Sequence, residues 1–154
     1  MVELVLARSS HRISYIYEGA HVTLRDFLDK VKAQGPTAAA IRGEPRLQQR
    51  KPAPKEWKKL IAALDRVAKH GFRVLEKTTV VKTWRVNDGT EVCEIRKGNV
   101  RVLFFEDEPP PDEGPTHLII THAFFKKSDE TPQPEIERFL HMRAQYYRWK
   151  SDAS

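Results

Sequence analysis

Cysteine is almost absent from this chain of 154 residues, in which Cys93 is the single thiol. One cysteine excludes an internal disulfide framework and a zinc site built from several cysteines. We therefore interpret Cys93 as a small hydrophobic residue of a strand rather than as a nucleophile. The scarcity of cysteine also makes an intracellular, cytoplasmic location the expectation for this protein.

Long apolar runs are missing as well, because no stretch approaches the roughly 20 residues that span a bilayer. The N-terminal residues 1–6 are too short, and too soon followed by polar residues, to form a secretory signal. We therefore expect no membrane partner. With 40% hydrophobic residues, the chain is long enough for a single domain over residues 1–154 with a substantial core.

Positive charge, by contrast, is abundant, with a formal net charge of +6 and a pI near 9.5. This balance favours an anionic partner. The basic excess lies between residues 35 and 59, and residues 35–54 are either a flexible loop or a short helix followed by a linker. The acidic counterpart, residues 107–115, is rich in proline and is interpreted as a stiff, solvated spacer.

Hydrophobic periodicity predicts an α+β fold. Helices are expected from Thr23 to Gly35, from Trp57 to Gly71, and after Thr131, which is a good N-cap residue. Strands are expected over residues 2–17 (one or two strands), 80–86, 90–97, 100–106 and 118–125. The C-terminal helix should bury one stripe at helical spacing, in which an arginine and a tyrosine continue an apolar face. This stripe consists of Ile136, Leu140, Arg143 and Tyr147, with Phe139 beside it.

The Gly98-Asn99 pair suits a two-residue hairpin turn with glycine first. Such a turn places Arg96 directly opposite Arg101, so that both guanidinium groups project from one face of the sheet. Like charges in this position are unfavourable by roughly a few tenths to 1 kcal/mol. The arrangement therefore indicates that an anion lies between the two arginines.

Four motifs occur in order between Trp57 and Tyr147. His122–Lys127, Thr131-Pro132, Glu135-Ile136 and Arg143 resemble the "H-G-F-x-K-K…T-P…E-I…R" signature of RelE-superfamily toxins of the HigB type, with Ala123 in place of the usual glycine. Upstream, Glu94–Arg96 resembles the "E-L-R" of this family and Arg101–Phe105 its "R-V-L-F". The resemblance implies a single RelE-like domain, in which helices pack on one face of an antiparallel sheet and a helix forms the C-terminus.

The resemblance also implies a function. Toxins of this type are mRNA interferases that cleave messages in the ribosomal A site and are held inactive by a cognate antitoxin. The expected partners are therefore mRNA, the ribosome and an antitoxin, which we expect to be a helix-turn-helix DNA-binding protein. Carried over by position, the catalytic and phosphate-binding set is Arg96, Arg101, Lys126, Lys127 and Arg143. The expected RNA-binding residues are Lys82, Phe124, Tyr146 and Tyr147, although the two tyrosines could instead complete the packing of the helix.

Cleavage of RNA at its own 2′-hydroxyl requires a base, stabilisation of the phosphorane charge and protonation of the leaving oxygen, but no metal or cofactor. Arginine suits the second task because its fork matches two phosphate oxygens. Lys126 and Lys127 are the candidate bases, whereas His122 is expected to be a satisfied core residue. Two other functions remain open: a non-catalytic RNA- or ribosome-binding module, and a phage interaction protein on the same scaffold.

Overall fold

The computed structural model describes residues 2–8, 10–16, 53–109, 112, 114–126 and 128–153. The predicted helix from Thr23 to Gly35, residues 35–52 of the basic segment, and Lys127 lie outside the described residues. The predictions for these residues therefore stay predictions.

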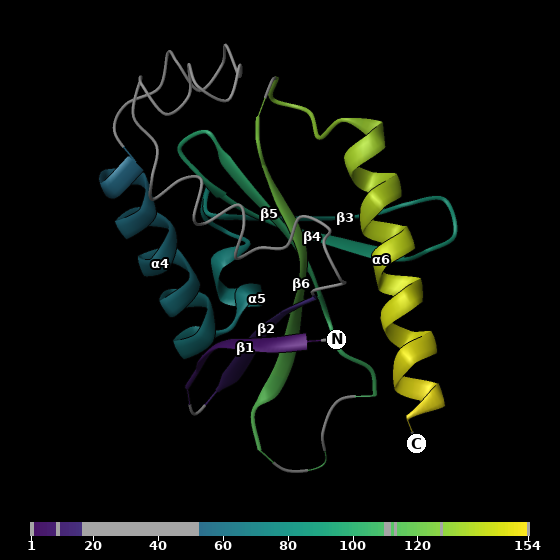
Figure 1. Cartoon of the computed structure of the whole chain (residues 1–154). Helices are drawn as coiled ribbons and strands as arrows, with labels where there is room; N and C mark the ends of the chain where they lie inside the picture. The colour runs from purple at the N-terminus through teal and green to yellow at the C-terminus, as the bar shows by residue number, and fades with distance from the viewer. Residues whose placement is uncertain are drawn as a thin grey trace.

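The described chain is built around a six-stranded sheet with the strand order β1-β2-β6-β5-β4-β3 (Figure 1). The strands are β1 (Val2–Ala7), β2 (His11–Ile16), β3 (Val81–Arg85), β4 (Glu91–Lys97), β5 (Val100–Glu106) and β6 (Thr116–Phe125). Neighbours are antiparallel except β2 and β6, which are parallel, so the sheet is mixed rather than wholly antiparallel. Strand β6 runs antiparallel to β5, which precedes it in the chain. The long connection between β2 and β6 allows these two strands to pair in parallel.

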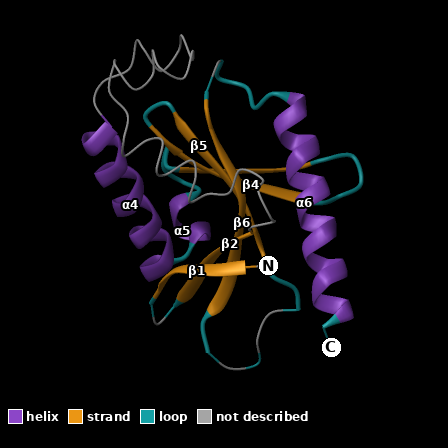
Figure 2. Ribbon diagram, in the orientation of Figure 1, coloured by secondary structure: helices purple, strands orange, loops and turns teal. Residues whose placement is uncertain are grey.

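Helices cover both faces of this sheet (Figure 2). Helices α4 (Ala53–His70) and α5 (Phe72–Leu75) lie on one face, and α6 (Gln133–Asp152) lies on the other. The α+β prediction is confirmed, but the expectation that the helices share one face is wrong. The reason is that both faces of the central strands are apolar, so each needs its own cover.

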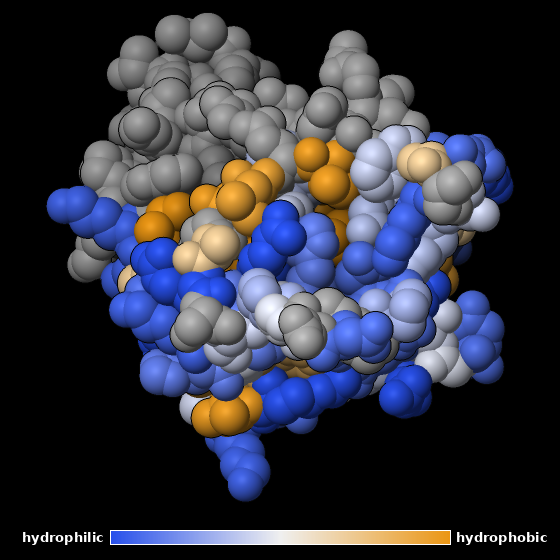
Figure 3. Space-filling view, turned by 90° about the horizontal axis from the view of Figure 1, so that it is seen from below, coloured by the Kyte–Doolittle hydropathy of each residue, from blue (hydrophilic) through white to orange (hydrophobic). Residues whose placement is uncertain are grey.

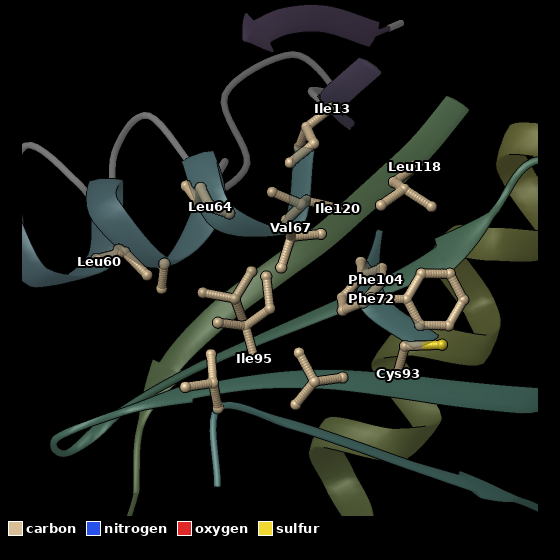
Figure 4. Close-up of a cluster of buried hydrophobic side chains, with 14 of the residues drawn as sticks. Ile13, Leu60, Leu64, Val67, Phe72, Cys93, Ile95, Phe104, Leu118 and Ile120 are labelled. Atoms are coloured by element: carbon tan, nitrogen blue, oxygen red, sulfur yellow. The ribbon is translucent and has the colours of Figure 1, made fainter. Parts of the chain in front are cut away.

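The first core fills the space between α4, α5 and the sheet (Figure 4). Leu64 and Val67 of α4 are fully buried there, and the ring of Phe72 meets that of Phe104 edge to face at 5.3 Å. Cys93 lies in this core with 1% of its surface exposed. This burial agrees with its interpretation as a small hydrophobic residue. Burial raises the pKa of its thiol, which removes the thiolate that a nucleophile needs.

The second core lies under α6, where Phe105 contacts the rings of Phe139 at 6.1 Å and Tyr146 at 5.5 Å. The buried stripe of α6 is therefore Phe139, Met142 and Tyr146, and the predicted stripe lies half-buried beside it. The helix is rotated because its rings pack around Phe105. Its N-cap is Pro132 rather than Thr131, whose hydroxyl has a different partner described below.

Hydrophilic side chains cover most of the described surface on the face that Figure 3 shows, with hydrophobic ones in small groups. Among the described helices, none has the length and apolar character needed to cross a bilayer.

Candidate functional site

The β4–β5 hairpin has the predicted register. Lys97 pairs with Val100 and Arg96 with Arg101, around a turn in which Gly98 has a φ of +58°. A positive φ at the first turn position is the conformation that glycine supplies at no steric cost. The turn chemistry thus fixes the position of the arginine pair.

The anion between the two arginines is a carboxylate of the protein itself. The side chain of Glu94 is buried, with its Oε1 atom 3.4 Å from Nε of Arg96 and 3.9 Å from Nε of Arg101. Thr131 donates a hydrogen bond of 2.6 Å to the other oxygen of Glu94. Sequence reasoning treated Glu94 only as part of a motif, although its place two residues before Arg96 puts both side chains on one face of β4.

Arg101 is almost completely buried, with 5% of its surface exposed. Its Nη1 atom donates to the carbonyl oxygens of Gly98 and Val100, both at 2.9 Å. Burial lowers its pKa, and the neighbouring charge of Arg96 lowers it further. The guanidinium still keeps its charge at neutral pH, because arginine is protonated in proteins far above this range.

The chain after β6 folds back over this hairpin. The backbone N–H of Lys126 donates to Asn99 O at 2.7 Å, and its Nζ lies 3.2 Å from Oδ1 of Asp129. Arg96 donates from Nη2 to the carbonyl oxygen of Asp129 at 3.4 Å, while its buried Nε has no hydrogen-bond acceptor within the described chain. The structure therefore brings Arg96, Arg101 and Lys126 together.

A pocket of about 420 Å³ opens at this end of the hairpin. Four of its lining side chains are cationic and, among the residues described, none carries a carboxylate. Its lining consists of Lys59, Thr79, Val80, Arg96, Lys97, Gly98 and Arg101, and we refer to it as the cationic pocket. Sequence reasoning assigned no role to Lys97, although its place next to the turn is the signal that could have indicated one.

Arg143 does not join this group. It lines a second pocket that shares no lining residue with the cationic pocket. Its guanidinium lies 5.6 Å from the ring of Phe105, which is four residues along β5 from Arg101, a span of about 13 Å. It also lies 5.0 Å from the ring of Tyr147, its neighbour on the predicted stripe.

The predicted RNA-binding residues are dispersed. Lys82 is exposed on β3, with its Nζ 5.6 Å from the ring of Trp84, and Phe124 is half-buried opposite Arg101. Tyr146 is 3% exposed, so its ring serves the packing of the helix, as the alternative interpretation of this residue holds.

Asp107 anchors α6 to the sheet. This first residue of the acidic segment is 9% exposed and accepts hydrogen bonds from the Tyr146 hydroxyl at 2.9 Å and from Nζ of Lys150 at 3.0 Å. The Tyr147 hydroxyl accepts a bond of 2.9 Å from the backbone N–H of Glu108. The prediction of a solvated spacer is therefore wrong for the first residue of this segment, because the carboxylate of Asp107 is bonded to side chains of α6.

His122 is the satisfied core histidine that the sequence predicted. It is 1% exposed, with Nδ1 at 3.1 Å from the hydroxyl of Thr121 and Nε2 at 3.2 Å from Oε2 of Glu135. The described residues contain no group of three or more histidine, cysteine or acidic side chains that could hold a metal ion.

The chain matches the model of a known family. Residues 50–143 match the family described as "Phage derived protein Gp49-like (DUF891)". The matched residues include α4, strands β3 to β6 and every residue of the cationic pocket. No curated protein sequence matches the chain.

Proposed function

Given that the chain belongs to the phage-derived Gp49-like family, which is associated with RelE-like toxins, we propose that it is the toxin of a type II toxin–antitoxin pair. The activity that we propose is the HigB-type one, ribosome-dependent endonucleolytic cleavage of mRNA without a metal ion. The observation that carries this proposal is the cationic pocket, in which four cations converge without a carboxylate among the described lining residues. Such a lining favours a phosphate group over a neutral ligand.

In the proposed reaction, the 2′-oxygen of the RNA attacks the adjacent phosphorus and the bond from phosphorus to the 5′-oxygen breaks. The products are a 2′,3′-cyclic phosphate and a 5′-hydroxyl. Arg96 and Arg101 stabilise the charge that develops on the phosphorane. Lys126, or Lys127 outside the described residues, accepts the 2′-proton, and a water molecule supplies the proton that the leaving 5′-oxygen takes up. Arg143 has no part in this step, because it lies in the other pocket.

The proposed partners are mRNA, the ribosome and an antitoxin of the helix-turn-helix DNA-binding kind. An acidic segment of the antitoxin, disordered before binding, would complement the charge of the cationic pocket and keep phosphate out. A complex in which this pocket is left open would contradict that part of the proposal.

The test is induced expression in a bacterial host, in which growth is followed and mRNA 5′ ends are mapped. The wild type should arrest growth and create new ends within translated frames. The Arg101→Ala/Lys126→Ala variant should lose both effects, since removal of one preorganised donor costs about 2.7–4 kcal/mol of the barrier. Because Arg101 is buried, Arg96→Ala/Lys97→Ala is the parallel variant at half-buried positions, and Lys77→Ala is the exposed control. Unchanged cleavage by both folded double variants would refute the proposed mechanism.

A second function, RNA or ribosome binding without catalysis, is favoured by one observation. Glu94 already lies against both arginines, and Arg101 is 5% exposed, as expected of a structural ion pair. Normal growth and no new mRNA ends, together with ribosome binding that Arg96→Ala/Lys97→Ala abolishes, would establish this function instead.

A further inference from the structure

A second pocket of about 340 Å³ lies between the β3–β4 turn, the end of β5 and the middle of α6. Figure 1 shows this turn beside α6, on the side of the molecule away from α4. The lining consists of Arg73, Arg85, Asp88, Gly89, Thr90, Glu91, Phe105, Glu106, Glu108 and Arg143, and we refer to it as the arginine–carboxylate pocket. Its volume is at the low end of the roughly 300–1,000 Å³ that small-ligand sites occupy.

The charges of this pocket differ from those of the cationic pocket. Three arginines are accompanied by four carboxylates. Arg73 is already occupied, because its two terminal nitrogens bind Glu91 at 2.8 and 2.6 Å. A phosphate finds no net positive charge here. A neutral group that carries both hydrogen-bond donors and acceptors fits this lining better.

Arg143 provides a flat surface in the pocket. Its guanidinium lies over the ring of Tyr147 at 5.0 Å and over that of Phe105 at 5.6 Å, and it forms no ion pair within the described residues. An arginine held in this way retains N–H donors along its edge. Guanidinium planes are also surfaces on which unstacked bases of RNA stack.

Asp88 provides the complementary acceptor. It lies on the exposed β3–β4 turn, where its Oδ1 accepts a bond of 2.8 Å from the backbone N–H of Thr90. That bond is the main cause of its lowered pKa, followed by a side-chain hydrogen bond from Thr90, and the charge of Arg143 also contributes. The carboxylate is exposed, so it can accept further hydrogen bonds from a ligand. An arginine edge and a carboxylate oxygen thus belong to one pocket.

We infer that the arginine–carboxylate pocket binds a guanine base. Guanine presents the O6 and N7 acceptors, which arginine reads, and also has N1–H and N2–H donors, which a carboxylate accepts. Adenine, cytosine and uracil lack this combination. The inference rests on the proposal that the protein acts on RNA. It assigns different parts of the RNA to the two pockets. The cationic pocket holds the backbone and the arginine–carboxylate pocket reads a base.

The test is saturation-transfer NMR on the full chain with guanosine, adenosine, cytidine and uridine, since nucleosides carry no phosphate for the cationic pocket. Guanosine should receive saturation and the other three should not. Arg143→Ala and Asp88→Asn should each weaken guanosine binding by about tenfold, the usual size of a base-reading pair. Asp88→Asn keeps an oxygen for the Thr90 N–H, so the turn is preserved. Lys77→Ala, which lies outside the pocket, should bind as the wild type does.

Equal saturation of all four nucleosides, or guanosine binding unaffected by Asp88→Asn, would overturn the inference. If Arg143→Ala does not fold, Asp88→Asn decides alone, because this side chain is exposed. The experiment uses neither ribosomes nor mRNA. Failure to bind guanosine would therefore leave the cleavage proposal standing, and absence of growth arrest would not alter the nucleoside result.

Discussion

The hydroxyl of Thr131 donates a hydrogen bond of 2.6 Å to the buried carboxylate of Glu94. Through this bond, the segment that leads into α6 is attached to the strand that carries Arg96. The same carboxylate lies against Arg96 and Arg101, so one acidic side chain connects β4, β5 and the start of the C-terminal helix. The position of the arginine pair therefore depends on a residue that need not touch a substrate.

Replacement of Glu94 by alanine is expected to destabilise the protein by about 3 kcal/mol, because it leaves the buried Arg101 without its counter-charge. Thr131→Val, which removes only the hydroxyl, should cost about 1.5 kcal/mol. Urea unfolding followed by circular dichroism measures both, with Glu137→Ala on the exposed side of α6 as the control. A loss below about 1 kcal/mol for Glu94→Ala would show that the arginines are held by other contacts.

Two adjacent tyrosines of α6 should differ in their contribution to stability. Tyr146→Phe removes a buried hydroxyl that donates to the carboxylate of Asp107, at a cost of about 2 kcal/mol. Tyr147→Phe removes an acceptor from the N–H of the exposed Glu108, which water can replace, so it should cost about 0.5 kcal/mol or less. The pair is its own control, because each variant loses one oxygen from the same helix. Equal losses in thermal unfolding would contradict the burial argument.

His117 should make the protein less stable in mild acid. Its ring lies 2.7 Å from the Ser14 hydroxyl, and burial lowers its pKa, with the charge of Arg12 as the next cause. Because the folded pKa lies below the unfolded value of 6.5, the unfolded chain binds the proton first. The contribution to stability is therefore complete above pH 6.5 and is lost as the pH falls through the folded pKa.

The measurement is the free energy of unfolding across this pH range for the wild type and His117→Gln. The difference between the two proteins should shrink as the pH falls, since glutamine does not titrate. A difference that grows in acid would mean that protonated His117 is stabilised by Asp107, whose Oδ2 lies 3.9 Å from the ring.

Features decided by local chemistry could be predicted from the sequence. The glycine-first turn and the alternation of the strands fix the register that places Arg96 opposite Arg101. The same alternation assigns Ile95 and Val102 to the core under α4. These predictions needed only neighbouring residues, and the structure confirms them.

Features decided by long-range packing could not be predicted. Helical spacing predicts that α6 has a buried side but does not fix the rotation of the helix about its own axis, which depends on the rings around Phe105. This rotation places Arg143 in the second pocket and buries Tyr146. The anion expected between the arginines is the carboxylate of Glu94, which lies two residues from Arg96 on the same strand.

Lys59 and Lys97 come from different elements, yet both line the cationic pocket, and each should contribute one phosphate contact. Replacing either by alanine should weaken binding of a fluorescent single-stranded RNA uniformly across sequences. It should also reduce the slope of log K against log salt by about 0.7, the value for one neutralised phosphate of a single strand.

An RNA with 2′-O-methyl groups lacks the attacking hydroxyl, so affinity is measured without cleavage. Lys69→Ala, on the same helix but paired with Asp65 at 2.9 Å, is the matched control and should leave the slope unchanged. If Lys59→Ala leaves the slope unchanged, as Lys69→Ala should, then the RNA does not contact Lys59, and the contribution of α4 to the pocket is structural.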